Sequence, residues 1–406
     1  MAVTSKDAFC IFFIMVKTGL DILSREFPKE LKGKRIGLLC HSASITSGYE
    51  HCVSVFVRSP CKLCALFGPQ HGMHGQTQDN MVEWEGTIHP ALKIPVYSLY
   101  GKSRSPTGES LSGIDALVID LQDVGARPYT YIWTVKLCMA ACEKAGLPVW
   151  ILDRPNPIAA ISCDGPLLSD RLFSFVGGAE IPLCHRMTLG EMAMVVKRRY
   201  CPSVDLHIVK MEGWWRNSLW HEIGLPWVLP SPNMPTVETA IVYPGMVLLE
   251  ATNLSEGRGT TRPFEIIGAP YVEPEAVLAE VKRFNLCGCV LRQHDFIPTF
   301  QKWKGETCQG IQVHVVEPRN YEPVFATAAL LYSVMKTSGG KFAFKNPPYE
   351  YDTSHMPFDI LSGDQTLRET LEQSGDIESL RNAWKNSCAG YWEWFEDIAL
   401  YSGEKQ

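Results

Sequence analysis

The sequence lacks the patterns that mark nucleotide-binding, membrane-spanning and nucleic-acid-binding proteins. It has no GxxxxGK motif followed by Ser or Thr, and Gly68, Gly72, Gly75, Gly257 and Gly259 are not spaced GxGxxG. A nucleotide, nicotinamide or flavin cofactor is therefore not expected. No apolar run reaches the roughly 18 residues of a membrane span. The formal net charge is -6 without a basic cluster, which argues against nucleic acid or an anionic membrane as partner.

Disulfide and zinc frameworks are also missing, although the chain has 14 cysteines. The close pairs Cys61/Cys64 and Cys287/Cys289 have no second pair at a finger-like distance, so no metal site is expected. A chain of 406 residues does not need disulfides to hold its core, which favours reduced thiols and a cytoplasmic location. The apolar run over residues 8–16 is short and has no cleavage site, so it is predicted to be part of a first helix.

What is present is an ordinary globular composition, with 46% hydrophobic and 20% charged residues over a length that exceeds one core. Apolar runs typical of strands alternate with runs typical of helices, which predicts an α/β fold with a doubly wound, mostly parallel sheet. Strands are expected over 35–41, 62–68, 94–100, 115–121 and 147–153, and helices over 49–57, 129–145 and 188–200. The last of these helices begins with a capping box of Thr188 and Glu191.

Beyond residue 157 the pattern predicts a second α/β domain. A proline-rich tract over 224–245 is interpreted as a rigid crossing between two halves, and the domains are placed at 15–225 and 226–406. In the second domain we expect helices over 274–284 and 323–336, strands over 290–300 and 310–316, and a helical end.

Polar side chains follow the expected strands at the point where each one ends. They are His41, Gln70 with His71, Gln122 with Asp120 and Asp123, and Arg154 with Asn156. Open parallel sheets bind ligands at the carboxyl ends of their strands, so these residues are candidates for binding or catalysis. Asp123 has an alternative role as the cap of the next helix. Tyr129 and Tyr131 are expected to face opposite ways, with at most one of them, Tyr131 by preference, at the ligand.

The segment EATNLSEGRGTTRPFE over 250–265 concentrates unlike polar groups between two apolar runs. Guanidinium groups can grip a carboxylate or phosphate in bidentate fashion, which predicts a ligand-binding loop. The alternative is an exposed turn whose charges pair among themselves. The candidates here are Asn253, Thr260, Arg258 and Arg262 for binding and Glu256 for catalysis. Two roles stay open for Glu256 and Glu250, which are to orient the two arginines or to serve as the second carboxylate.

Six long motifs identify a family. They are GPQHGMHG (68–75), PVYSLYG (95–101), DLQDVGARPYTYIWT (120–134), LDRPNPI (152–158), LPSPNMPT (229–236, with the candidate Asn233) and LLEATNLSEGRGTTRPFEIIGAP (248–270). From about Lys17 to Tyr401 the chain resembles the DUF1343 family of NamZ-type exo-β-N-acetylmuramidases. The resemblance implies a Rossmann-like N-terminal half, a smaller α/β half and a cleft between them. It also implies removal of N-acetylmuramic acid from the non-reducing end of peptidoglycan fragments.

One departure from the family pattern affects the expected chemistry. Many relatives read PEHG where this chain has Gln70, and a glutamine cannot transfer a proton. Glycoside hydrolysis needs a carboxyl group that stays protonated near neutral pH. Glu83 or Glu85 is a candidate for a relocated acid, with the intervening tryptophan as apolar wall. The alternative is a chain that has kept the sugar cleft and lost or changed the chemistry, and so acts as a sugar- or muropeptide-binding protein.

The lactyl carboxylate of N-acetylmuramic acid is a natural partner for Arg258 or Arg262. Reduced cysteines fit recycling of imported cell-wall fragments.

Overall fold

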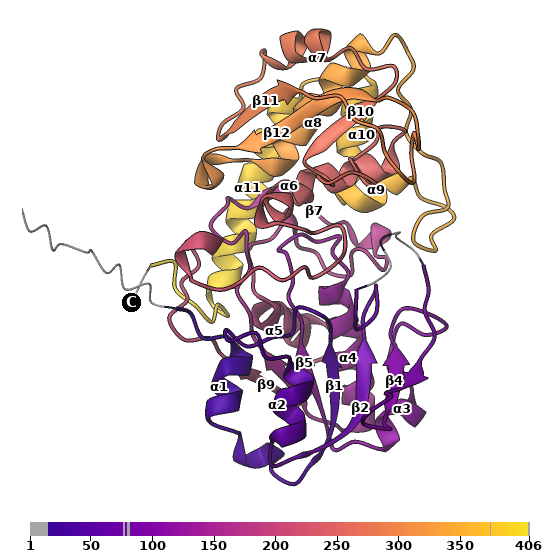
Figure 1. Ribbon diagram of the computed structural model, residues 1–406. Coiled ribbons are helices and arrows are strands. Elements are labelled where there is room, and N and C mark those ends of the chain that lie inside the picture. Colours follow the sequence, from indigo (N-terminus) through magenta and orange to yellow (C-terminus); the bar gives the residue numbers. More distant parts are fainter. Residues whose placement is uncertain (1–14, 76–77, 79–81, 374, 405–406) are drawn as a thin grey trace, which may run out of the picture.

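The first half of the chain builds a seven-stranded sheet (Figure 1), seen in a computed structural model that describes residues 15–75, 78, 82–373 and 375–404. In spatial order the strands are β3 (Thr87–Ile88), β4 (Pro95–Ser98), β2 (Lys62–Gly68), β1 (Arg35–Cys40), β5 (Ala116–Asp120), β6 (Val149–Leu152) and β9 (Leu206–Val209). Every neighbouring pair is parallel except β3 with β4. The predicted mostly parallel sheet is confirmed.

Helices cover both faces of this sheet because successive strand side chains point to opposite sides. In β5, Leu117 and Ile119 belong to one core, while Ala116 and Val118 belong to the other. The first core is covered by α3 (Gly108–Ser112), α4 (Tyr131–Ala145) and α5 (Leu189–Arg199), the second by α1 (Gly19–Arg25) and α2 (Cys52–Arg58). Strands buried on both faces must be apolar along their whole length, which is why they could be found in the sequence.

Helix ends follow the expected capping chemistry. The predicted capping box of α5 forms between Thr188 and Glu191, and α4 ends at Gly146 with φ at 66°. Residues 8–14 of the predicted first helix lie outside the described residues, and the first helix after them begins at Gly19. No helix in the described part of the chain is both long and apolar enough to cross a bilayer.

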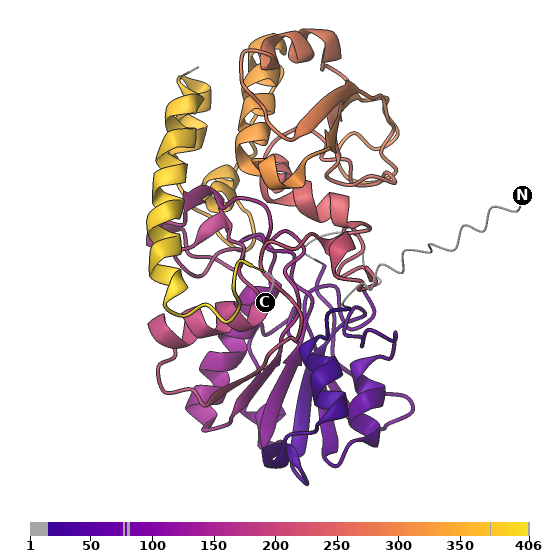
Figure 2. The same cartoon turned by 90° about the vertical axis from the view of Figure 1, so that its left-hand side faces the viewer.

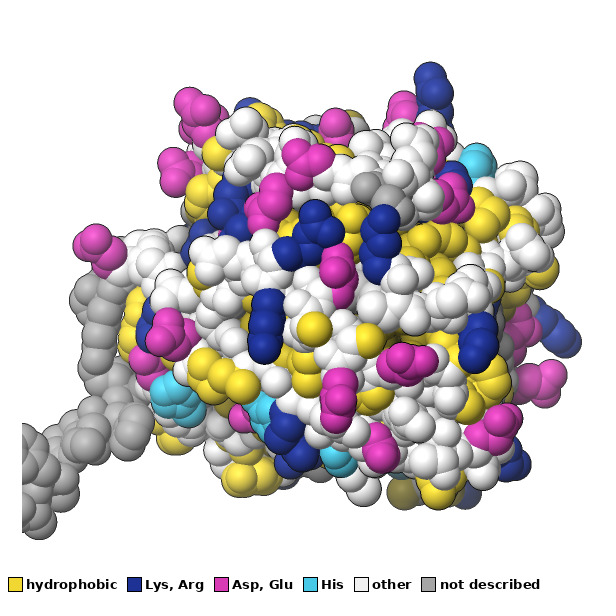
Figure 3. Space-filling view, turned by 90° about the horizontal axis from the view of Figure 1, so that it is seen from above, with side chains coloured by type: hydrophobic (Ala, Val, Ile, Leu, Met, Phe, Trp, Pro, Cys, Tyr) yellow, Lys and Arg dark blue, Asp and Glu magenta, His cyan; other side chains and the backbone are white. Residues whose placement is uncertain are grey.

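The second, smaller unit lies above the sheet in Figure 1 and contains an antiparallel sheet in the order β10 (Ile266–Ala269), β12 (Gln309–Val315), β11 (Cys289–Gln293). Helices α6 (Val237–Met246) and α7 (Pro274–Val281) pack against it, and α8 (Pro323–Thr337) packs against both helices. The strand predicted over 290–300 is wrong beyond Gln293, because the chain turns away there and keeps only an isolated bridge between Phe296 and Cys308. On the face seen in Figure 3, acidic and basic side chains are interspersed.

The C-terminal helices return to the first unit. After α9 (Pro357–Ser362) and α10 (Thr366–Glu372), helix α11 (Ile377–Glu396) runs along one side of the molecule and packs on the hairpin of β7 (Asp164–Leu167) and β8 (Pro182–Cys184) (Figure 2). Residues from both sides of the predicted boundary at 225/226 therefore lie together, and that boundary stays a prediction.

Candidate active site

A pocket lies where the carboxyl ends of β2 and β5 meet the second unit. It encloses about 540 Å³ of space, the open solvent at its mouth included. It is lined by residues from three parts of the chain: Gln70, His71, Pro128, Tyr129, Thr130, Tyr131 and Val176 from the first unit, Ser231, Asn233 and Met234 from the proline-rich tract, and Tyr243, Val247, Glu250, Arg258, Phe264, Tyr349 and Glu350 from the second.

Two carboxyl groups lie in this pocket, Glu250 and Glu350. Glu250 is on a 3₁₀ helix (Val247–Ala251) that follows α6. Its Oε1 accepts a hydrogen bond from Nη2 of Arg258 at 2.6 Å, and its Oε2 accepts one from the hydroxyl of Tyr349 at 2.9 Å. Glu350 is 6% exposed, and the hydroxyl of Tyr100 donates to its Oε2 at 3.4 Å. Glu250 thus has a cationic partner, whereas Glu350 accepts its hydrogen bond from a neutral phenol.

Burial raises the pKa of Glu350 from 4.5 to about 7, and the nearby charge of Glu250 acts in the same direction. A carboxyl group with this pKa carries its proton for about half of the time at neutral pH and can donate it. Two carboxyl groups in one pocket with different environments are the arrangement from which acid and base roles arise.

The backbone at Glu350 is held in an unusual conformation. Its φ is +43°, and that of Tyr351 is +71°, a region that non-glycine residues seldom occupy. Tyr349 and Asp352 close the turn by exchanging two backbone hydrogen bonds of 2.9 Å each. Strain of this kind persists where the surrounding structure imposes it, and it clusters at functional sites.

The charges of the 250–265 segment pair among themselves, but in a buried place. Nε of Arg258 lies 3.3 Å from Glu256, and Nζ of Lys302 lies 2.6 Å from the other oxygen of Glu256. Burial alone would raise the pKa of Glu256, but Lys302 and Arg258 together lower it. Glu256 is therefore a carboxylate that holds Arg258 in position, and it is not among the residues that line the pocket. The alternative of an exposed turn is wrong about exposure, because Glu250, Glu256 and Arg258 are buried. It is right that the charges of this segment pair with one another.

Five of the residues predicted from sequence line the pocket: Gln70, His71, Tyr131, Asn233 and Arg258. The hydroxyl of Thr130 donates to Oε1 of Gln70 at 2.7 Å, which leaves the amide nitrogen of Gln70 as the end that can reach a ligand. The expectation that Tyr129 and Tyr131 face opposite ways is wrong. Both line the pocket, with ring centroids 4.8 Å apart, because Tyr129 lies in a turn before α4 and not within the helix predicted from residue 129.

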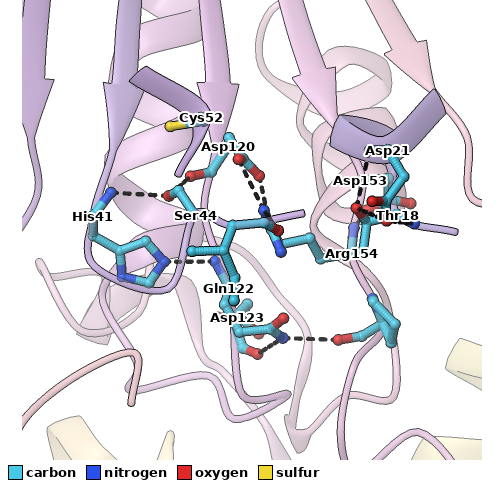
Figure 4. A network of polar contacts seen from close by, with 12 residues as sticks. Thr18, Asp21, His41, Ser44, Cys52, Asp120, Gln122, Asp123, Asp153 and Arg154 are labelled. Carbon is cyan, nitrogen blue, oxygen red and sulfur yellow. Dashed lines mark hydrogen bonds and ion pairs between the residues drawn. The ribbon is translucent and has the colours of Figure 1, made fainter. Parts of the chain in front are cut away.

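His41, Asp120 and Arg154 lie instead in a buried network at the ends of β1, β5 and β6 (Figure 4). Nε and Nη2 of Arg154 donate to the two oxygens of Asp120 at 2.5 and 2.9 Å. Nε2 of His41 accepts from the backbone N–H of Gln122 at 2.9 Å, and its Nδ1 contacts the carbonyl of Pro230 at 3.2 Å. Burial lowers the pKa of His41 to about 3, so the ring is neutral. This network lies at the point where the strand order reverses, between β1 and β5, and it braces the strand ends. Gln122 and Arg154 also line a second, smaller pocket there.

Asp123 and Asn156 are buried nearby and do not line the pocket. The expected role of Asp123 as a helix cap is wrong, since its Oδ2 accepts instead from the N–H of Gly125 at 2.7 Å. Burial raises the pKa of Asp123 to about 7. Asn156 holds a turn, donating to the carbonyl of Met187 and accepting from the N–H of Ile158, both at 2.9 Å.

Glu83 and Glu85 are exposed and do not line the pocket. Oε1 of Glu83 accepts from the hydroxyl of Tyr351 at 2.9 Å. The tryptophan between them, Trp84, covers Gly68, where an added Cβ would lie 2.7 Å from its ring. The pocket therefore contains Glu350 and neither Glu83 nor Glu85.

The remaining candidates lie in the second unit, outside the pocket. Asn253 ties its loop to the segment at 341–343, since its Oδ1 accepts from the N–H of Ala343 and its Nδ2 donates to the carbonyl of Lys341. Thr260 and Arg262 line a neighbouring groove.

Sequence reasoning missed Glu350 together with its neighbours Tyr100 and Tyr349. The only local signal is a single acidic residue between two tyrosines, in the tract PPYEY. Nothing in that tract shows that it folds back against residues 100 and 250.

One cluster of metal-ligating atoms occurs among the described residues, formed by Cys40, His51 and Cys52 within 4.8 Å of one another. Nδ1 of His51 caps α2 by accepting from the N–H of Val53 at 3.3 Å, and its Nε2 contacts the carbonyl of His41 at 2.9 Å. Both ring nitrogens already have backbone partners, so we interpret this cluster as packing.

Comparison with known proteins extends these observations. Residues 36–238 match the N-terminal domain and residues 241–401 the C-terminal domain of the family described as exo-β-N-acetylmuramidase NamZ. The chain is 40% identical over 373 residues to the peptidoglycan β-N-acetylmuramidase NamZ of Bacillus subtilis (strain 168), which covers 92% of this chain and 88% of that protein. A DUF1343 family protein of Bacteroides fragilis superimposes with a TM-score of 0.85 at 31% identity, covering 96% of this chain and 100% of the other. A second protein of that family and organism gives 0.74 at 26% identity, covering 96% and 99%.

Proposed function

This chain belongs to the exo-β-N-acetylmuramidase NamZ family, and we propose that it is an exo-acting glycosidase that releases N-acetylmuramic acid from the non-reducing end of peptidoglycan-derived fragments. The observation that carries the proposal is the pair of carboxyl groups in one pocket, Glu250 and Glu350. The pocket also offers hydroxyl and amide groups suited to the hydroxyls of one sugar ring, among them Tyr131, Asn233 and the amide nitrogen of Gln70.

Glu350 is the proposed general acid. Its carboxyl group donates a proton to the glycosidic oxygen as the bond from that oxygen to the anomeric carbon breaks. Glu250 is the proposed second carboxylate, kept in the pocket by Arg258 and Tyr349, and it stabilises the positive charge that develops on the sugar ring. Water then supplies the hydroxyl group at the anomeric carbon, and its proton returns to a carboxylate of the pocket.

The direct test is hydrolysis of two substrates, p-nitrophenyl N-acetylmuraminide and the disaccharide of N-acetylmuramic acid linked to N-acetylglucosamine. The parent chain is expected to cleave both, and Glu350→Gln and Glu250→Gln are expected to lose activity. Glu83→Gln and Glu85→Gln test the sequence-based assignment of the acid, and Glu109→Gln in α3 is an exposed control. Full activity in Glu350→Gln would show that Glu350 is not the general acid.

Gln70 favours a second candidate, a muropeptide-binding protein without turnover. It occupies the pocket at a position where the resemblance implies a glutamate in many relatives. In that case the parent would bind N-acetylmuramic acid without cleaving either substrate, and activity would appear in Gln70→Glu.

Arg258 is the proposed partner of the lactyl carboxylate, because it lines the pocket and Arg262 does not. Its Nη2 and Nε face Glu250 and Glu256, which leaves Nη1 for a ligand. In Arg258→Met, binding of N-acetylmuramic acid should weaken much more than binding of N-acetylglucosamine. Equal losses for the two sugars would contradict this role.

A cytoplasmic location and a part in recycling cell-wall fragments are supported by the cysteines. Among the described residues, 13 cysteines carry free thiols, as is usual in a reducing compartment. Fractionation of the native host, with detection of the chain by antibody, tests this location.

A further inference from the structure

An open groove in the second unit adjoins the pocket. It encloses about 970 Å³, the open solvent at its mouth included. Its walls come from the loop before β10 and from the segment after β11, and the residues that line it are Gln78, Asn233, Gly259, Thr260, Thr261, Arg262, Ile266, His294, Phe296, Ile297, Thr299 and Phe300. Asn233 lines both the pocket and the groove, so this residue borders both spaces.

The groove combines apolar and hydrogen-bonding side chains in the manner of a sugar site. Ile297 is 55% exposed, and it lies with Phe296 and Phe300 on one wall. Exposed apolar side chains grouped beside polar ones often mark a ligand surface. Arg262 and His294 supply charged and polar groups. A pyranose ring has an apolar face and a rim of hydroxyl groups, and both find partners here.

The two walls are fixed to each other. The N–H and the hydroxyl of Thr299 both donate to the carbonyl of Gly259 at 2.9 Å. Gly259 has a φ of +79°, and an added Cβ would lie 2.8 Å from the backbone nitrogens of Thr299 and Phe300. Only glycine permits this approach, so the groove keeps its shape without a ligand.

Arg262 forms an ion pair and still keeps N–H donors that can bind a ligand. Its Nη1 lies 3.2 Å from Oε2 of Glu265, while its side chain stays 49% exposed. Glu265 is buried and also accepts from the hydroxyl of Thr239 at 2.7 Å. A guanidinium has five N–H donors, so Arg262 keeps donors for a ligand in the groove.

We propose that this groove binds the leaving group of the reaction, the amino sugar on the reducing side of the bond that is cut. The inference rests on the proposed function, in which the pocket holds the N-acetylmuramic acid residue. The next sugar must lie beside the pocket, and the groove borders the pocket at Asn233. Arg262 donates to a hydroxyl or acetamido oxygen of this sugar, and Ile297 packs against its apolar face.

Steady-state kinetics of Arg262→Met and Ile297→Ser on the two substrates test the proposal. The p-nitrophenyl substrate has no second sugar, so its kcat/KM should fall by less than about threefold. For the disaccharide, kcat/KM should fall by about tenfold or more through a higher KM, as expected for one hydrogen bond from a charged donor.

Matched controls exist in the chain. Arg283 pairs with Glu280 as Arg262 does with Glu265, and its side chain is 56% exposed. Ile88 is 60% exposed and outside the groove. Arg283→Met and Ile88→Ser should leave kcat/KM for both substrates unchanged.

Two results would overturn the inference. An unchanged disaccharide reaction in Arg262→Met and Ile297→Ser would show that the groove does not bind the leaving group. Equal losses on both substrates would show that these residues act on the muramyl sugar itself. If the parent cleaves neither substrate, the proposed function fails separately. Calorimetry then decides about the groove, because the disaccharide should bind more tightly than N-acetylmuramic acid, and the two groove variants should abolish that difference.

Discussion

Replacing Glu350 by glutamine should remove activity and at the same time stabilise the protein at alkaline pH. Glutamine keeps the size of the side chain and cannot donate a proton. Loss of a general acid costs about 10²- to 10⁴-fold in rate, or about 3–5 kcal/mol. The loss should be larger for the disaccharide than for the p-nitrophenyl substrate, because a sugar alkoxide needs a proton to leave and p-nitrophenolate does not. In the parent, kcat/KM should fall as the pH rises above about 7, where Glu350 loses its proton.

The stability effect follows from the same pKa. Because the folded-state pKa of Glu350 is raised from 4.5 to about 7, the folded chain keeps a proton in this interval that the unfolded chain has released. Stability therefore falls as the pH rises from about 4.5 to 7. At about 1.36 kcal/mol per pKa unit, the group costs about 3 kcal/mol above pH 7. Glu350→Gln carries no such cost.

Urea denaturation at pH 5 and pH 8, together with the pH profile of kcat/KM, measures both effects. The free energy of unfolding of Glu350→Gln should drop less between the two pH values than that of the parent. A variant that loses activity with an unchanged pH dependence of stability would show that Glu350 does not titrate near neutral pH. If Glu350→Gln is active and its kcat/KM still falls above about pH 7, the general acid is another residue.

Three further predictions concern other buried groups. Gln70→Glu should change the pH profile of kcat/KM, because it adds a third carboxyl group to the pocket; a profile identical to that of the parent would show that position 70 takes no part in proton transfer. Asp120→Asn should lower the free energy of unfolding by about 3–5 kcal/mol, because it leaves Arg154 buried without its anion. As a comparison, Asp115 forms a partly exposed ion pair with Arg35, and Asp115→Asn should lower the free energy of unfolding by less than about 1 kcal/mol. Arg127→Lys should lose about 2–4 kcal/mol in the same urea titration, because a fully buried guanidinium donates to four backbone carbonyls and an ammonium cannot reach all of them; a variant as stable as the parent would contradict this.

The strand ends show how far local patterns lead toward the site. The rule that parallel strands present ligand-binding residues at their carboxyl ends led to Gln70 and His71, which line the pocket. The same rule included His41, Asp120 and Arg154, which the fold uses to satisfy one another in a buried network. A strand end shows that a polar side chain reaches the edge of the sheet. Whether it meets ligand or protein depends on the segments that cover that edge.

The sequence by itself determined the parallel sheet, the helices that cover it and the family. Those features depend on the spacing of apolar residues, the length of apolar runs and the residues that cap helices. Each of these is a local pattern that spans only a few neighbouring residues. The tertiary structure decided which carboxyl groups share the pocket, because the fold brings together Glu250 and Glu350, which are 100 positions apart in the sequence. Only there does burial raise the pKa of Glu350 to about 7. Burial and neighbouring charge are properties of the packed chain, so the acid could not be found in the sequence.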